Sequence, residues 1–256
     1  MLDKSPLDFG VLSARWRLKT LRQHCVHLIN YSLSGIWRLL RALGIHYKKG
    51  QQHIHSPDAE YGAKKERIET CVEAARAEPG DVITLFLDEF SFYRWPTPAP
   101  VYAPAGREQP KADLLPGYNT RSRIVCAVDV STGQVLYRQR AKITVGVLVD
   151  FLEDIRQAFP AAQQIHVIQD NWHRVHFHPN QVEAAARLGI DLVPLPVYAP
   201  WLNPCEKVGR KMRQDIIHMH RQADDWLQLK DRVDAFFAQF ASGSSELLRY
   251  IGLLPA

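Results

Sequence analysis

The sequence predicts a mixed α/β domain, in which helices cover a sheet, preceded by a small helix-turn-helix unit. Three observations predict this fold: a basic N-terminal segment with two apolar helical stripes, three strand patterns in succession, and a later alternation of helix and strand patterns. The 256 residues suffice for one large domain, or for a medium domain with a small one. With 46% hydrophobic and 23% charged residues, the composition is globular and excludes disordered and collagen-like classes.

Positive charge is concentrated in the N-terminal segment. Residues 1–57 carry nine lysines and arginines against two aspartates, a net charge of +7, which leaves −2 for the rest of the chain. A basic block beside a slightly acidic body indicates binding to a polyanion, although a solvated surface gives the same pattern.

Two helical stripes lie within this block, separated by a turn at residues 30–32. Ser32 or Ser34 is placed to cap the second helix, and Gly44 is placed to end it. Two short helices around a tight turn, followed by a basic strand or arm, form a helix-turn-helix arrangement, although any helical hairpin shares the stripes. The stripes are Leu18, Leu21, Cys25 and Leu28, then Ile36, Leu39, Leu40 and Leu43.

We therefore predict that residues 1–57 form a winged-helix-like DNA-binding domain with a basic arm. Arg38 and Arg41 lie on the outer face of the second helix, and Lys48 and Lys49 follow in the arm. These four cations are the expected DNA contacts of this domain.

Residues 58–80 are expected to form a linker helix, which Pro79 and Gly80 end. The remainder, residues 81–256, is the expected catalytic domain, and its stretch from 95 to 116 is a proline-rich irregular loop. Its predicted strands are residues 82–87, 124–130, 135–140, 165–169 and 191–194, and its predicted helices are 144–159, 180–188, 203–220 and a last one striped from Trp226 to Phe240.

Three carboxylates stand at the ends of predicted elements: Asp88 closes one strand, Asp170 follows another, and Glu206 lies in the first turn of a helix. In open α/β sheets the carboxyl ends of strands border the active-site crevice. Three converging carboxylates suit two Mg²⁺ or Mn²⁺ ions, which together activate an attacking oxygen at a phosphodiester.

Each carboxylate also has a structural interpretation. Asp88 suits a turn after a strand, and Asp170 with Asn171 suits an Asx turn. With Asn203 as N-cap and Pro204 at N1, Glu206 suits a capping box.

The three motifs together resemble one known family. The chain has DE after an apolar strand, DNWHRVH after another, and then YAPWLNPCEKVGRKMRQ. This set resembles the DDE transposases of the mariner superfamily, in its bacterial insertion-sequence branch, and the likeness extends over nearly the whole chain. It implies that Asp88, Asp170 and Glu206 form the catalytic triad, and 35 residues separate the last two, close to the family's usual interval.

The resemblance further implies a ribonuclease-H-like core, two Mg²⁺ ions per site for which Mn²⁺ can substitute, and cut-and-paste transposition. The implied partner is double-stranded DNA, namely transposon terminal inverted repeats and a TA target, bound by a homodimer in the reacting complex. A bacterial cytoplasmic protein associated with the nucleoid is expected.

The chain departs from the family pattern at two places. Starting from Met1 it has room for one helix-turn-helix unit where relatives have two, and position 209 is Gly where relatives often have Trp. The alternatives are therefore a truncated or co-opted transposase that binds DNA without catalysis, and a structure-specific nuclease on the same core.

Several residues near the motifs have supporting roles in this interpretation. Arg210 and Arg213 lie on the same helix face as Glu206 and suit phosphates beside the cut, as Arg121 suits the wider DNA channel. Asn171 and Asn203 are expected to hold the carboxylates in place, and His176 is expected either to do the same or to contact DNA. Direct metal binding by the cluster His173, His176 and His178 is disfavoured, since imidazole prefers zinc to magnesium.

Cysteine spacing and hydropathy add two expectations. The four cysteines form no CxxC pair, a pattern that favours reduced thiols over a zinc ribbon or disulfide framework. No apolar run approaches the ~18–20 residues of a membrane span.

Overall fold

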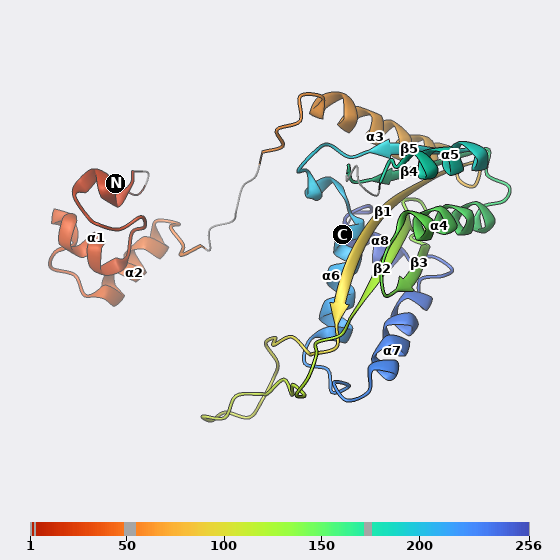
Figure 1. Cartoon of the computed structure of the whole chain (residues 1–256). Helices are drawn as coiled ribbons and strands as arrows, with labels where there is room; N and C mark the ends of the chain where they lie inside the picture. Colours follow the sequence, from red (N-terminus) through yellow and green to blue (C-terminus); the bar gives the residue numbers. More distant parts are fainter. Residues whose placement is uncertain (1, 3, 49–54, 172–175, 256) are drawn as a thin grey trace. The chain divides into compact units, whose positions relative to one another are not determined.

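The computed structural model describes residues 2, 4–48, 55–171 and 176–255 (Figure 1). The chain divides into two compact units, Met1–His53 and Ile54–Ala256, each with its own internal contacts.

The N-terminal unit is helical. A 3-10 turn, η1 (Pro6–Phe9), precedes α1 (Leu18–His24), and a second turn, η2 (Val26–Leu28), leads to α2 (Leu33–Ala42). Its small core consists of Leu21, Leu28 and Ile36, all buried. The predicted first helix ends earlier than expected, because Cys25 adopts an extended backbone and the last stripe residue, Leu28, lies in η2.

The second helix begins and ends as predicted. Ser32 is its N-cap, and the Ser32 hydroxyl accepts a hydrogen bond from the Gly35 amide at 3.0 Å. Gly44, at φ 73°, follows its last turn in the left-handed region that favours glycine.

The cations expected to contact DNA are exposed in this unit. Arg38 and Arg41 project from α2, and the Arg41 guanidinium lies over the Trp37 ring, 5.0 Å from its centroid. Lys48 is exposed in a segment without helix or strand, and Lys49 lies outside the described residues.

The second unit contains a five-stranded mixed sheet in the order β3-β2-β1-β4-β5. The strands β1 (Val82–Tyr93), β2 (Arg121–Asp129) and β3 (Val135–Arg140) form an antiparallel meander. The strands β4 (Gln164–Gln169) and β5 (Ile190–Pro194) continue the sheet in parallel from β1. The predicted mixed α/β sheet is therefore confirmed.

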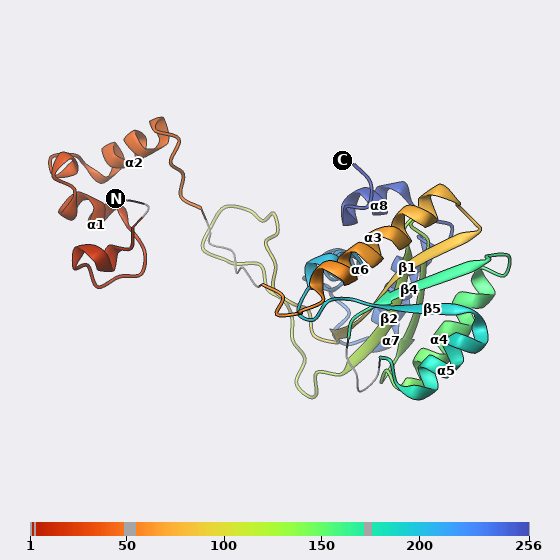
Figure 2. The same cartoon turned by 90° about the horizontal axis from the view of Figure 1, so that it is seen from above.

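Helices cover both faces of this sheet (Figure 2). Alternate residues of β2 point to opposite faces, so Ile124 and Cys126 belong to one core while Val125 and Ala127 belong to the other. The first core is closed by α3 (Tyr61–Ala77), α6 (Cys205–Met212), α7 (Trp226–Ala238) and α8 (Ser245–Ile251), and the second by α4 (Val145–Ala158) and α5 (Pro179–Leu188).

The first strand is longer than predicted. The apolar run ends at Leu87, but β1 continues to Tyr93 because β2 pairs with it over the whole stretch from Leu85 to Tyr93. Its parallel partner β4 pairs only with residues 82–86. Asp88 therefore lies within a strand and not at its end, and the structure corrects both the predicted boundary and the turn interpretation.

The loop between β1 and β2 is irregular, as its prolines predict, and projects beyond the end of the sheet in Figure 1. Arg94 anchors its start, since its Nε donates to the carbonyl of Ala223 at 2.5 Å.

The helix that carries Glu206 is shorter than the predicted 203–220. It begins at Cys205 with Pro204 as N-cap, so Glu206 is the second helical residue and not the third. After Met212 the chain continues as a π-helical turn, Arg213–Ile217. Such wide turns are frequent near functional sites in helices.

Close packing explains the glycine in this helix. A Cβ atom on Gly209 would lie 2.9 Å from Cδ1 and 3.0 Å from Cγ of the Phe90 ring, distances that side chains do not tolerate. Phe90 on β1 therefore fills the space that a side chain at position 209 would need.

This packing predicts that Gly209→Ala destabilises the protein by about 1–2 kcal/mol, because overpacking outweighs the gain in helix propensity. In a Phe90→Ala background the same change should stabilise it by up to about 1 kcal/mol. Urea unfolding of wild type, Gly209→Ala, Phe90→Ala and the double variant measures both changes in the free energy of unfolding. As a control, Gly62→Ala in α3 meets no atom within 4 Å and should be stabilising. If Gly209→Ala changes the free energy of unfolding in the same direction with Phe90 and with Ala at position 90, this account is wrong.

Candidate active site

The three carboxylates singled out in the sequence line one cavity. Asp88 of β1, Asp170 after β4 and Glu206 of α6 border a space of about 500 Å³. Asn171 and Asn203 line the same cavity, together with the segment from Leu195 to Pro200. The structure therefore brings together five of the predicted site residues, from elements far apart in the sequence.

Asp88 is partly buried and lies close to three other carboxylates. Burial raises its pKa to about 7, with further contributions from the neighbouring carboxylates of Glu89, Glu206 and Asp170. Its Oδ1 accepts a hydrogen bond from the Glu89 amide at 2.9 Å, which opposes the shift.

Asn203 ties the helix start to the strand beside Asp88. Its Nδ2 donates to the carbonyl of Leu87 at 3.1 Å, and its Oδ1 accepts from the Cys205 amide at 3.1 Å. The side chain is 4% exposed, so both hydrogen bonds are shielded from water. One amide thus fixes the start of α6, and with it Glu206, relative to β1.

His176 bridges two carboxylates at the opposite wall. Its Nε2 lies 2.6 Å from Oε1 of Glu89, and its Nδ1 contacts the carboxylate of Asp170. Burial alone would lower its pKa, but the hydrogen bonds that the ring donates to the carboxylates of Asp170 and Glu89 prevail and raise it to about 10. The cationic ring, 1% exposed, therefore holds Asp170 against β1.

Two arginines share the face of Glu206. Burial raises the pKa of the Glu206 carboxyl, while the charges of Arg210 and Arg213 oppose that shift. Both arginines are exposed. They are available to an anion that approaches Glu206.

The donor chemistry of this cavity fits hard divalent cations. Carboxylate oxygens are the ligands that Mg²⁺ prefers, and a cation among them would relieve the repulsion that raises the pKa of Asp88. Among the described residues, no three His, Cys, Asp or Glu side chains already form a closed metal cluster.

The remaining predicted residues lie elsewhere. Arg121 is exposed at the start of β2 and does not line the cavity. His178 is the N-cap of α5, where its Nδ1 accepts from the Asn180 amide at 3.2 Å, and His173 lies outside the described residues.

Two residues of this site escaped the sequence analysis. Glu89 holds His176, and the only available signal was its place beside Asp88. Tyr198 lines the cavity, is 71% exposed, and has a positive φ of 53°, uncommon for a bulky residue and frequent at functional sites.

The cavity wall is attached to the segment that enters α3. Val197, which lines the cavity, accepts a hydrogen bond from the Ser56 hydroxyl at 2.6 Å and donates to Oδ2 of Asp58 at 2.9 Å. The half-exposed Trp201 donates to the Tyr61 hydroxyl at 3.3 Å. The segment that leads into the predicted linker helix therefore supports the wall of the cavity.

A larger cavity of about 920 Å³ lies between the β1–β2 loop and Met219–Arg221. Its walls are mostly exposed loop residues and contain none of the three carboxylates. The smaller cavity is therefore the better candidate for catalysis.

A sequence comparison decides the family. The profile described as "DDE superfamily endonuclease" matches residues 83–230, more than half of the chain, including all three carboxylates. The chain belongs to the DDE endonuclease superfamily. Endonucleases of this superfamily are enzymes that cleave phosphodiester bonds.

Relatives of this DDE protein include an uncharacterized 39 kDa protein of the insertion element IS630 from Shigella sonnei. The two are 22% identical over 232 residues, which is 90% of this chain and 66% of the relative, just under two thirds of its length.

Solved structures support the fold of the DDE protein. The Mos1 mariner paired-end complex with Mn has a TM-score of 0.66 and 17% identity, covering 96% of this chain and 78% of that one. The Mos1 paired-end complex with the left transposon end has a TM-score of 0.63 and 16% identity, covering 97% and 81%. The predicted ribonuclease-H-like fold and the resemblance to mariner transposases are confirmed.

The cysteines and the helices complete the description of the chain. The four cysteines form no disulfide. No helix in the described ranges of the DDE protein has the length and apolar character to cross a membrane.

The attachment at Val197 predicts a pH-dependent stability. Hydrogen bonds from Lys64, then from the amides of Val197 and Glu60, lower the pKa of Asp58 to about 2 from 3.8. Because the folded pKa is depressed, its contribution is present above pH 3.8 and is lost as pH falls through about 2. The melting temperature of Asp58→Asn should therefore lie below wild type at pH 7 and converge with it toward pH 2.

The exposed loop variant Asp113→Asn is the matched control, with no difference from wild type expected at any pH. A difference in melting temperature between Asp58→Asn and wild type that stays constant from pH 7 to pH 2 would contradict an ionic attachment.

Proposed function

We propose that this DDE protein is a metal-dependent DNA transposase that cleaves transposon ends and joins them to target DNA. The observation that carries the proposal is the single cavity lined by Asp88, Asp170 and Glu206 in a chain of the DDE endonuclease superfamily. Residues 1–57 act as the DNA-binding domain with its arm, 58–80 as the linker helix, and 81–256 as the catalytic domain.

Asp88, Asp170 and Glu206 would hold two Mg²⁺ ions, for which Mn²⁺ can substitute. When bound, such ions activate water or a 3′-hydroxyl and stabilise the leaving oxygen at a phosphodiester. His176 orients Asp170, and Asn203 orients α6 so that Glu206 faces the cavity. Asn171 lies in the cavity wall beside Asp170, where its amide is available to a substrate.

Arginines and lysines supply the contacts to DNA. Arg210 and Arg213 lie beside Glu206 and would hold phosphates flanking the cut. Arg38, Arg41, Lys48 and Lys49 would bind the terminal inverted repeats through the N-terminal unit, with Arg121 further along the catalytic unit. Related structures are described as paired-end complexes with a transposon end, which supports a homodimer as the reacting form and, with the mariner likeness, a TA target.

The first test is nicking of supercoiled plasmid in the presence of Mn²⁺. Wild type should nick, and Asp170→Asn should reduce the rate by at least about 10³-fold, because a missing carboxylate removes a ligand for the activating ions. Binding to transposon-end duplex should remain within about 3-fold of wild type, since phosphate contacts dominate DNA affinity.

The same assay separates the alternative functions. Binding without any nicking by wild type would indicate a truncated or co-opted protein that only binds DNA. Cleavage that prefers branched or hybrid substrates to transposon-end duplex would indicate a structure-specific nuclease. The intact carboxylate set favours transposition over DNA binding without catalysis.

His176 provides a second test, because it acts through Asp170. Mutation of a residue that is hydrogen-bonded to a metal ligand typically weakens metal binding by about 10–100-fold, so His176→Ala should raise the Mn²⁺ concentration for half-maximal nicking by that factor. Saturating Mn²⁺ should restore most of the rate.

His166→Ala is the matched control. His166 is also a buried histidine paired with a carboxylate, 2.9 Å from Oδ2 of Asp191, but it does not line the cavity. Its Mn²⁺ requirement should equal that of wild type. If both variants raise the Mn²⁺ concentration for half-maximal nicking equally, His176 contributes only to the stability of the fold.

A further inference from the structure

Two buried glutamine side chains form a reciprocal pair between the sheet and α5. Gln169 is the last residue of β4 and Gln181 lies in α5, and both are fully buried. Nε2 of Gln181 donates to Oε1 of Gln169 at 3.2 Å, and Nε2 of Gln169 donates to Oε1 of Gln181 at 3.4 Å. The pair lies on the sheet face that α4 and α5 cover, because Val167, two residues before Gln169 on β4, belongs to that core.

The pair holds the chain directly before Asp170 and directly after His176. Gln169 precedes Asp170 in the sequence, and Phe177 follows His176. The Phe177 amide donates to Oε1 of Gln181 at 2.8 Å, a shorter bond than either one between the two glutamines. Phe177 has a positive φ of 57°, a conformation that a bulky residue keeps only where its surroundings enforce it. Gln181 therefore fixes the backbone on both sides of the two site residues.

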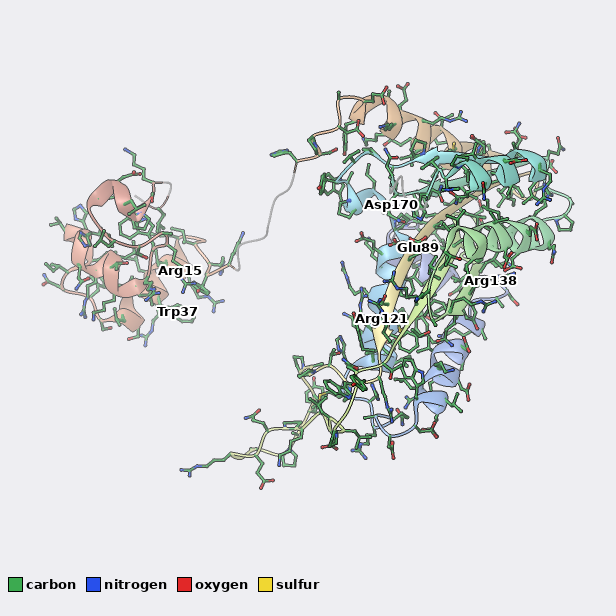
Figure 3. All side chains as sticks on the ribbon, viewed as in Figure 1. Arg15, Trp37, Glu89, Arg121, Arg138 and Asp170 are labelled. Carbon is green, nitrogen blue, oxygen red and sulfur yellow. The ribbon has the colours of Figure 1, made fainter. Side chains whose placement is uncertain are left out.

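The two site residues are joined to each other and to β1. The His176 ring contacts the carboxylate of Asp170 through Nδ1, and its Nε2 lies 2.6 Å from Oε1 of Glu89. Glu89 shares its face of β1 with Leu87, which belongs to the core under α4 and α5, whereas Asp88 lies on the opposite face. Figure 3 shows Glu89 and Asp170 near each other, as the shared contact with His176 requires. Asp170 is thus supported from the α5 side of the sheet.

The stability of the fold does not by itself explain two amide side chains at this place. The core that α4 and α5 close is built of apolar side chains, and replacing both partners of a buried hydrogen bond by apolar groups of the same shape is often nearly neutral. An apolar side chain at position 181, however, could not accept the hydrogen bond from the Phe177 amide. Because that amide can only donate, it requires Oε1 of Gln181 and leaves Nε2 for Gln169. The glutamine at this position suits control of the backbone beside His176.

We propose that Gln181 is a positioning residue for metal binding, which holds Asp170 and His176 in place through Gln169 and the Phe177 amide. This proposal rests on the proposed function and extends it to a residue that does not line the cavity. Without these hydrogen bonds, a divalent cation would have to order His176 and Asp170 as it binds. Its affinity then falls, because a ligand arranged in advance loses less conformational freedom on binding.

The test is Mn²⁺ binding by the full-length chain without DNA, followed by the electron paramagnetic resonance signal of free Mn²⁺. Binding at the site is the part that Asp170→Asn removes. Gln181→Met keeps the length of the side chain and removes its hydrogen bonds, and it should weaken this binding by about 10-fold. This factor is the lower end of the range for a direct partner of a metal ligand, because Gln181 acts through one more residue. Plasmid nicking should need a correspondingly higher Mn²⁺ concentration, with most of the rate restored at saturation.

Thr84→Val is the matched control. Thr84 is also fully buried, and its hydroxyl donates to the carbonyl of Cys71 at 2.8 Å, but it does not line the cavity. Its Mn²⁺ affinity should equal that of wild type although its melting temperature falls. The proposal is overturned if Gln181→Met binds Mn²⁺ as tightly as wild type, or if Thr84→Val weakens binding to the same extent. If wild type shows no Mn²⁺ binding that Asp170→Asn removes, the proposed function fails as well.

The double variant Gln169→Met/Gln181→Met separates positioning from stability, and it keeps the test valid if the single variant is unstable. Gln181→Met leaves the Gln169 amide without its partner, whereas the double variant removes that amide, so its melting temperature should equal or exceed that of the single variant. Its Mn²⁺ affinity should stay low, because the Phe177 amide still lacks its acceptor. Recovery of Mn²⁺ affinity together with the melting temperature would overturn the proposal and assign Gln181 to stability alone.

Discussion

The site depends on the unequal pairing of β1. Its parallel partner β4 leaves it after Phe86, whereas its antiparallel partner β2 follows it to Tyr93. The sheet therefore opens on one side of β1 just before Asp88, while the other side keeps that residue rigid. The crevice is a consequence of strand lengths, in agreement with the rule that α/β sheets bind ligands at the carboxyl ends of parallel strands.

Around this opening, negative charge is concentrated and then held in place. Burial, and then the neighbouring carboxylates, raise the pKa of Asp88, an arrangement that costs stability in the absence of a cation. His176 and Asn203 offset part of that cost, one through ionic contacts to Glu89 and Asp170 and the other through buried hydrogen bonds. The fold thus positions negative charges that it neutralises only in part.

Much of the fold follows from the sequence because local patterns report burial. Alternation and helical stripes located all five strands, and the β2–β3 hairpin forms at Ser131–Gly133, where Asp129 accepts from both the amide and the hydroxyl of Thr132. The extension of β1 was missed because Asp88 and Glu89 interrupt the apolar run, and only long-range pairing with β2 makes them part of a strand. Likewise, Glu89 gains its role from a histidine 87 residues away, a contact that no local pattern contains.

The hydrogen bonds at Val197 fix the start of the second unit against the wall of the cavity. Since Ser56 and Asp58 bind the backbone of a residue in the cavity wall, the chain from the N-terminal unit is tethered at the wall itself and not at the first turn of α3. From Ala42 to Ser56 the chain spans at most about 50 Å when fully extended. DNA bound by α2, as the proposed function requires, would share one covalent tether with the carboxylates, so that its effective concentration there would be set by the length of the tether and not by its concentration in solution.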